Sequence, residues 1–367
     1  MQGKSYRASV IPPLPDFRVK CKEPFSTTGI DYTGALTVRT ENRQTEKAYI
    51  ILFTCPVSRA IHMELVNNLS CHSFLLAFRK FCNRRSFPSL VLSDNATTFV
   101  AAAGFLRDIA ESREVQEHLI DIKCSWQFIP ARAPWFGAIW ERLIGLVKAC
   151  LKKVLGQALV TFEELCCILI ELEAIINDRP LGYDPGDLNQ LEVLTPNHLL
   201  YGRKLRIFPK EVISWEEFSS DPTVGIGDDV TRRFKYISHL CDHLWKRWKR
   251  EYLSALRETH NNNVRSNTWP GVGDLVLIHD EGPRAKWKMG RIIGLYPGGD
   301  GIVRVVQLKT SVGLLNRPTV KLYPLELSST VEPDDSPEDA APSQRPTRRT
   351  ALVAAQARKR LVETGQL

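Results

Sequence analysis

Apolar and polar positions along the first half of the chain repeat with two different periods, which predict strands and helices in turn. Three β-type runs, rich in Ile, Val, Thr and aromatic residues, occupy 28–38, 47–57 and 59–66. Only short polar segments join them. We therefore expect three antiparallel strands at the start of the folded chain.

The next segments alternate between the two periods. Residues 71–85 carry an apolar face at helical spacing, formed by Phe74, Leu75, Phe78 and Phe81. A short buried strand is expected at 89–94, a second helix at 97–111 and a further strand at 124–131. This βββαβαβ order predicts an α/β fold in which helices cover a mixed sheet.

Two more helices are predicted before the pattern changes. The first begins at Glu141 and ends near Leu155. Thr161 and Glu164 form a capping-box pattern that opens the second, which ends before Pro180.

The second half of the chain is organised differently. Loops and turns are expected at 194–209, a long amphipathic helix at 229–260, and a β-rich segment with Gly- and Pro-containing turns at 270–327. The division we predict is an extended lead-in (1–24), a core (25–185), a loop and helical connector (186–265), a β-barrel-like module (266–327) and a disordered tail (328–367).

Composition narrows the classes of partner and compartment. The formal net charge is +8, which favours a polyanion such as nucleic acid. Nine cysteines without a CxxC pair argue against a disulfide framework and a zinc ribbon, and fit a reducing compartment, the nucleus or cytoplasm. No signal-peptide pattern or membrane-length apolar run is present, so we expect a soluble, non-secreted protein without a membrane partner.

Three carboxylates stand at positions where a catalytic set can form. Asp31 lies inside the first predicted strand, Asp94 at the end of the fourth, and Glu141 at the start of a helix. If they converge, their mutual repulsion requires cations, and oxygen ligands suit Mg²⁺ or Mn²⁺. Two such ions would clamp the attacking and leaving oxygens of a phosphoryl displacement.

Each acid also has an ordinary structural interpretation when it is taken alone. Asp31 can be a strand-edge acid, Asp94 an N-cap, and Glu141 a first-turn acid that complements the helix dipole. Their combination in this order of elements favours the metal site.

Five motifs resemble the integrase region of BEL/Pao-type LTR retrotransposon polyproteins, within the retroviral integrase and DDE transposase superfamily. They are "GIDYTG", "LSDNATTF", "FIPARAPWFGAIWERLIGLVK", "EAIINDRPL" and "LTPNHLLYGR", and the resemblance covers about residues 10–327. It implies an RNase H-like fold with Asp31, Asp94 and Glu141 as catalytic metal ligands.

Two features depart from that family's usual pattern. The interval between Asp94 and Glu141 is longer than in retroviral integrases, although it fits the BEL/Pao branch. No His-His-Cys-Cys zinc constellation precedes Asp31, so we expect no zinc in this chain, which leaves zinc-assisted assembly in doubt.

Basic and polar residues near the acids are candidates for contact with DNA. Lys148 and Lys152 fall on the helical stripe of Glu141, and the resemblance implies a DNA-contacting lysine at Lys148. For Lys152 a solvated face is the alternative. Asn95 either orients Asp94, touches substrate, or simply starts a helix.

Other parts of the chain offer further candidates for contact with nucleic acid. The basic and aromatic residues of 232–258 either contact phosphates or form an ordinary joining helix. Trp135, Phe136 and Trp140 either stack on bases or anchor the fold. In the module, Lys286, Lys288, Arg291 and Arg304 predict a basic face for DNA, with protein binding as the competing use.

The sequence therefore predicts a metal-dependent polynucleotidyl transferase that trims DNA 3′ ends and joins them to target DNA. Its partners would be element ends, target DNA and further copies of itself. Two alternatives remain: an RNase H-like nuclease without strand joining, and a non-catalytic DNA-binding or scaffolding protein derived from the element.

Overall fold

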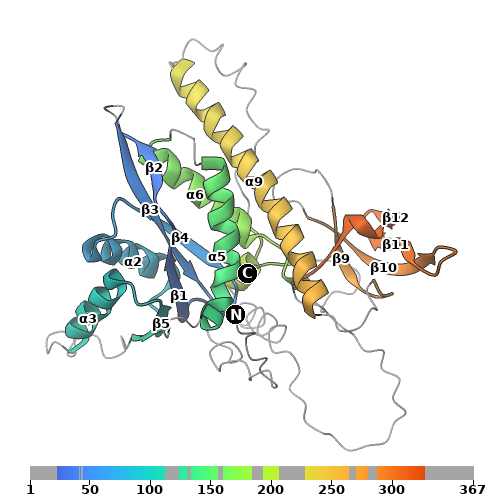
Figure 1. The fold of residues 1–367 in the computed structure, drawn as a ribbon, viewed down its shortest axis with the longest axis horizontal. Helices are drawn as coiled ribbons and strands as arrows, with labels where there is room; N and C mark the ends of the chain where they lie inside the picture. Colours follow the sequence, from blue (N-terminus) through green and yellow to red (C-terminus); the bar gives the residue numbers. More distant parts are fainter. Residues whose placement is uncertain are drawn as a thin grey trace, which may run out of the picture.

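The computed structural model describes residues 23–40, 42, 44–111, 124–129, 134–155, 160–183, 193–205, 228–263, 270–279 and 287–326. Within these ranges, only the backbone is described at 109–111, 134–142, 183, 228–231 and 259–263. The predicted lead-in before residue 23 and the predicted tail at 328–367 lie outside the described part. Figure 1 shows a mixed sheet with helices on both faces, a long helix beside it, and a second sheet at the far end of that helix.

A six-stranded mixed sheet forms the centre of the first half. Its strands are β1 (Thr27–Tyr32), β2 (Leu36–Arg39), β3 (Thr45–Thr54), β4 (Ile61–Val66), β5 (Leu90–Ser93) and β6 (Ser125–Phe128). β1 and β2 pair antiparallel with successive parts of β3, and β4 pairs antiparallel with β3 on its other edge. β5 is parallel to β1, and β6 is parallel to β5. The antiparallel strands β1 to β4, followed by the parallel strands β5 and β6, confirm the expected RNase H-like fold class.

One predicted strand is divided in two. The run at 28–38 is broken at Thr33, whose backbone N–H donates to Ile50 O at 2.9 Å while its hydroxyl accepts from Ile50 N at 3.0 Å. The Thr33 hydroxyl thus accepts the Ile50 N–H hydrogen bond that a backbone carbonyl would accept in a continuous strand pair. β2 resumes the pairing with β3 after the interruption.

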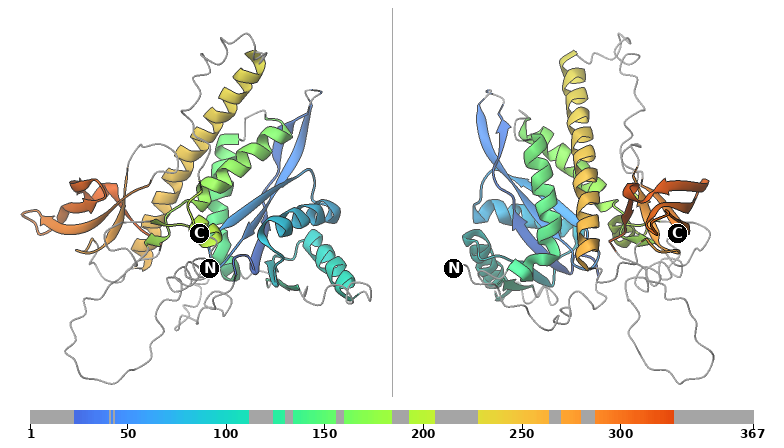
Figure 2. Two further views of the ribbon diagram at one scale, coloured as in Figure 1. Left: turned by 180° about the vertical axis from the view of Figure 1, so that it is seen from behind. Right: turned by 45° about the vertical axis from the view of Figure 1, so that its right-hand side comes forward.

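Helices cover both faces of this sheet (Figure 2). They are α2 (Cys71–Arg85), α3 (Thr97–Glu111), α5 (Pro134–Leu155), α6 (Phe162–Asn177), α7 (Pro196–Tyr201) and α9 (Asp228–Asn263). α2 and α3 pack on one face over an aromatic core that includes Phe53, Phe74 and Phe81. α5, α6 and α9 enclose the other core. None of the described helices combines the length and apolar character needed to cross a bilayer.

Two predictions about the helices were wrong. α5 begins at Pro134 instead of Glu141, because proline is well tolerated at the first position of a helix and the aromatic residues after it continue the helix. Part of the predicted loop at 194–209 is helix α7, which Thr195 caps and Gly202 ends in the left-handed conformation. Nearby, β7 (Gly182–Tyr183) and β8 (Val193–Leu194) form a small antiparallel pair.

The "EAIINDRPL" motif fastens α6 to the sheet. Asn177 accepts from the Ile61 backbone N–H and donates to the Ile61 carbonyl, both at 2.8 Å. Glu173 accepts from the Met63 N–H at 2.8 Å. These side chains satisfy backbone groups of β4, and this explains why polar residues stand on a buried helix face.

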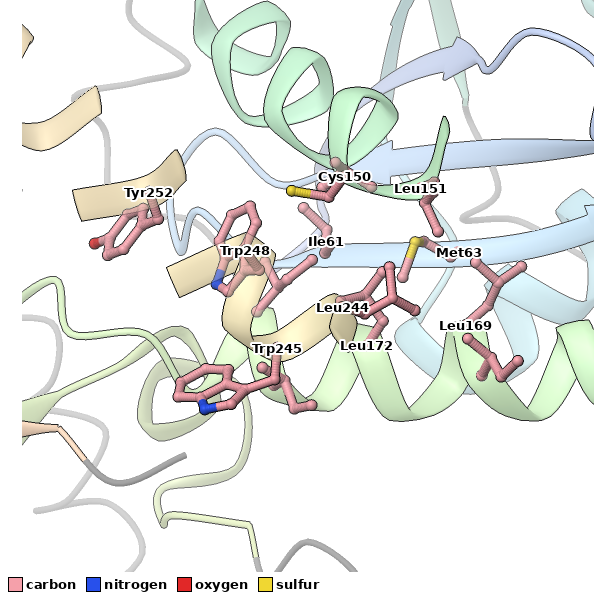
Figure 3. Close-up of a cluster of buried hydrophobic side chains, with 14 of the residues drawn as sticks. Ile61, Met63, Cys150, Leu151, Leu169, Leu172, Leu244, Trp245, Trp248 and Tyr252 are labelled. Carbon is pink, nitrogen blue, oxygen red and sulfur yellow. The ribbon is translucent and has the colours of Figure 1, made fainter. Parts of the chain in front are cut away.

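The long helix α9 belongs to the core and is more than a connector. Trp248 is fully buried, and Figure 3 shows it with Leu244 against Cys150 of α5, Leu172 of α6 and Ile61 of β4. Helix α9 thereby completes the apolar face that α5 and α6 leave open.

A five-stranded antiparallel sheet follows α9, in the place of the expected barrel-like module. Its strands are β9 (Leu275–Ile278), β10 (Lys288–Pro297), β11 (Val303–Thr310), β12 (Gly313–Pro318) and β13 (Leu322–Pro324), in the order β12-β11-β10-β9-β13. A separate apolar cluster, with Ile292, Val306 and Leu308 at its centre, holds the sheet together.

A buried ion-pair network joins this module to the core. Glu326, just after β13, accepts from Arg59 at 2.7 Å, from Arg179 at 2.9 Å and from the Tyr252 hydroxyl at 2.9 Å. Arg59 lies in the β3–β4 turn, Arg179 follows α6, and Tyr252 belongs to α9. Burial alone raises the pKa of the Glu326 carboxyl, but the charges and hydrogen bonds of the two arginines outweigh it and lower the pKa to about 2.

Replacing Glu326 with Gln should destabilise the protein by about 3–5 kcal/mol, because Arg179 would keep a buried charge without its partner. Urea unfolding followed by circular dichroism measures the loss. The matched control is Glu46→Gln at the exposed start of β3, for which we expect a change within about 0.5 kcal/mol. Equal unfolding free energies for the two variants would contradict the role of this network.

The lowered pKa of Glu326 predicts that the free energy of unfolding depends on pH. Its folded pKa of about 2 lies below its ordinary value of 4.5, so its contribution is complete above about pH 4.5 and is lost as the pH falls towards 2. The difference in unfolding free energy between the natural protein and Glu326→Gln should therefore shrink between pH 5 and pH 2.5. A constant difference over that range would show that Glu326 does not titrate as this geometry requires.

Candidate active site

Two of the three predicted acids lie side by side at one edge of the sheet. In the parallel pairing of β1 with β5, Ile30 lies opposite Ser93, so the next residues along the two strands are Asp31 and Asp94. Neighbouring strands are about 4.8 Å apart. The pairing register itself therefore brings the two carboxylates together.

Alternation along the strands places both acids on the same face. Ile30 and Tyr32 contact the aromatic core under α2 and α3, so Asp31 between them points to the opposite face. Leu92 belongs to the core under α5, and Asp94, two residues further on, continues on that face. Both carboxylates thus belong to the side of the sheet that α5 covers.

Lys148 of α5 reaches this edge directly. Its ammonium lies 2.8 Å from Oδ2 of Asp31, and about a third of each side chain is exposed. This pair partly neutralises the acidic edge. The sequence resemblance implied a DNA contact for Lys148, and nothing in the sequence indicated that it would contact Asp31.

Asp94 and Asn95 form an exposed turn between β5 and α3. Asp94 Oδ1 accepts from the Ala96 backbone N–H at 3.1 Å, which restricts the position of the carboxylate. The Asn95 amide donates to the Ile129 carbonyl at 3.0 Å and so ties the turn to the end of β6. Asn95 therefore supports the position of Asp94, while its contact with substrate stays a prediction.

Glu141 lies on α5, but its side chain is outside the described part of the structure, as are those of Trp135, Phe136 and Trp140. Glu141 precedes Lys148 by two helical turns, about 10.5 Å along the axis. Long helical side chains lean towards the N-terminus, which brings the Lys148 ammonium back in the direction of Glu141. The core-facing side of α5 carries Ile144, Val147 and Cys150, which are buried.

The donor chemistry of this edge fits a divalent metal ion. Asp31 and Asp94 supply hard carboxylate oxygens from two rigid strand ends, and such oxygens are the ligands that Mg²⁺ and Mn²⁺ prefer. The Lys148 ammonium already holds positive charge 2.8 Å from Asp31. Among the described side chains, no group of three or more His, Cys, Asp or Glu residues has a metal-binding arrangement.

The other predicted nucleic-acid residues are dispersed. Lys152 is exposed on α5. Lys288 and Arg291, three residues apart on β10, point to opposite faces of that strand. Arg304 pairs with Asp300 at 2.6 Å, and Lys286 lies outside the described residues. The single basic face expected in the module is therefore not formed by Lys288 and Arg291, because an odd spacing in a strand separates their side chains.

Comparison with known proteins gives a partial match. A family of unknown function (DUF5641) matches residues 232–325, which extend from α9 to just after β13. No curated protein matches the chain.

Solved structures with similarity to the chain include two of viral integrases. The HTLV-2 integrase catalytic core domain in complex with magnesium is 14% identical, with 49% of this chain and 98% of that chain covered and a TM-score of 0.31. The simian T-cell lymphotropic virus intasome in complex with the PP2A regulatory subunit B56 gamma is 10% identical, with 83% and 79% covered and a TM-score of 0.32.

Replacing Lys148 with Met should increase the affinity of the protein for Mn²⁺, because a metal ion at Asp31 must displace the ammonium. A partly exposed ion pair contributes about 0.2–1 kcal/mol, which corresponds to roughly a 1.5- to 5-fold increase in affinity. Electron paramagnetic resonance of free Mn²⁺ measures binding without DNA or turnover. Lys152→Met is the control on the same helix, and an equal increase in that variant would assign the effect to net charge instead of the Asp31 contact.

Proposed function

We propose that this protein is a retroelement integrase of the BEL/Pao type, a metal-dependent polynucleotidyl transferase that processes DNA 3′ ends and joins them to target DNA. The observation that supports it most strongly is the β1–β5 pairing, which sets Asp31 beside Asp94 at the end of two parallel strands. Helix α5, which carries Glu141, passes the same edge and contacts Asp31 through Lys148.

In this proposal Asp31, Asp94 and Glu141 are the catalytic carboxylates and hold two Mg²⁺ or Mn²⁺ ions. When bound, the ions would stabilise the charge that develops on the attacking and leaving oxygens of a phosphodiester. Asp31 and Asp94 are suited to this role because rigid neighbouring strands fix their backbone positions. The Ala96 N–H and the Asn95 contact with β6 restrict Asp94 further.

The basic residues of the same helix would hold the DNA backbone. Lys148 and Lys152 follow Glu141 along α5. Once the Lys148 ammonium is displaced from Asp31, it is available to a phosphate. Lys286, Lys288 and Arg291 are proposed contacts of the C-terminal module. Self-association and a nuclear or cytoplasmic location remain predictions from the sequence.

Asp94→Asn should lower strand transfer by about 100-fold or more, because several kcal/mol of metal-dependent stabilisation would be lost. Purified protein, a labelled duplex with the element's terminal sequence, a target plasmid and Mg²⁺ or Mn²⁺ provide the assay. Asp108→Asn, an exposed acid on α3, is the matched control and should join ends at the natural rate.

The products of this assay separate the alternatives. Cleaved but unjoined ends from the natural protein would indicate a nuclease. DNA binding with neither cleavage nor joining would indicate a scaffolding protein. Undiminished joining by Asp94→Asn would refute the assignment of the acids.

A further inference from the structure

Helix α9 presents one line of basic and histidine side chains to solvent. Its members, called here the basic stripe, are Lys235, His239, His243, Lys246 and Arg250, and all five are exposed. At about 100° per residue they fall within a sector of about 80°, and they extend for about 22 Å along the helix axis. The stripe thus follows one side of α9, the long helix that Figure 1 shows beside the sheet.

No acidic side chain interrupts the stripe. From Lys235 to Arg250, the five members are the exposed residues of α9, and every other position is buried or half-buried. Asp242, the acid of this stretch, is half-buried beside the line. Like charges one turn apart, such as Lys246 and Arg250, destabilise an isolated helix slightly. With neutral histidines the row carries three formal positive charges, and Asp242 at its edge, one turn before Lys246, can offset one of them.

Other basic residues of α9 are used in packing. Arg233 forms an ion pair with Glu164 of α6, and Arg247 with Glu251 of α9. The Lys249 ammonium lies 5.8 Å from the ring centre of Trp245 and 5.7 Å from that of Trp287. In the described part of the chain, the lysines and the arginine of the stripe make no such contact. Some basic residues of α9 therefore make contacts within the protein, while those of the basic stripe face solvent.

The two histidines strengthen this interpretation. The ring centres of His239 and His243 are 4.3 Å apart, in the middle of the stripe. An imidazole carries an N–H donor in both of its protonation states, so each ring can donate to a phosphate oxygen. Together with the flanking charges, they form a row of five donors facing one direction.

We propose that the basic stripe of α9 is a binding site for the phosphodiester backbone of a nucleic acid. A duplex carries one charge per about 1.7 Å of axis, so a 22 Å length carries roughly 13 phosphate charges, of which those on the side facing α9 are available to the stripe. The proposal deepens the DNA binding of the proposed function, on which the choice of a nucleic-acid ligand rests. It assigns that binding to a surface outside the acid set.

The test compares two variants that lose the same charge. The stripe variant is Lys235→Gln, Lys246→Gln and Arg250→Gln together. The control is Lys47→Gln, Arg79→Gln and Lys80→Gln, three exposed residues of β3 and α2 on which the proposal does not depend. Glutamine is a good helix former, so we expect both variants to fold, which circular dichroism checks.

Fluorescence anisotropy with a labelled duplex DNA, repeated over a series of salt concentrations, measures binding. Three lost phosphate contacts should lower the slope of log affinity against log salt by about 2.7, and should weaken binding at least about tenfold at low salt. The control should keep both values. Parallel titrations with single-stranded DNA and double-stranded RNA distinguish the nucleic acids that share this backbone.

An unchanged slope in the stripe variant, or an equal loss in both variants, would overturn the proposal. The first result would leave the stripe as a solvated surface or a protein contact, and the second would show a dependence on net charge alone. Either failure would be distinct from failure of the proposed function, because that function is tested by Asp94→Asn in a joining assay and the stripe by binding alone.

Discussion

The parallel pairing of β1 with β5 is the constraint on which the proposed active site depends. It sets Asp31 against Asp94 through a backbone ladder, so the two carboxylates are neighbours before any side-chain contact forms. Two like charges at this distance repel each other, and burial against α5 would increase that cost. The structure moderates it by leaving both acids partly exposed and by placing the Lys148 ammonium on Asp31. A site with two neighbouring carboxylates and one adjacent ammonium is suited to bind a further cation.

Helix α9 links this edge to the rest of the molecule. Its buried face completes the core that begins with β4, α5 and α6, and its last turns support the C-terminal sheet through Tyr252 and Glu326. Its outward face carries the basic stripe. One element thus fixes the position of the module, stabilises the helix that carries Glu141, and presents a charged surface. The ion-pair network at Glu326 makes the module part of the same body as the core.

Much of this architecture could be predicted from the hydrophobic pattern, because α2 buries one apolar face at helical spacing and β3 contains a continuous apolar run that is buried on both faces. The acids Asp31 and Asp94 could also be predicted, since a charged residue within or just after an apolar strand is unusual. The start of α5 could not, because "PWFG" fits a loop as well as a first helical turn. The contacts of Lys148 and Glu326 join residues that are 117 and 267 positions away in the chain, and no local pattern encodes such pairs.

The most direct test of the central claim is Mn²⁺ binding to the natural protein, Asp31→Asn, Asp94→Asn and the double variant, measured without DNA. If the two carboxylates share one site, each single variant loses most of the affinity and the double variant loses little more, because contacting residues are not independent. Losses that simply add, or binding that survives in both single variants, would show that the two acids do not form a common metal site.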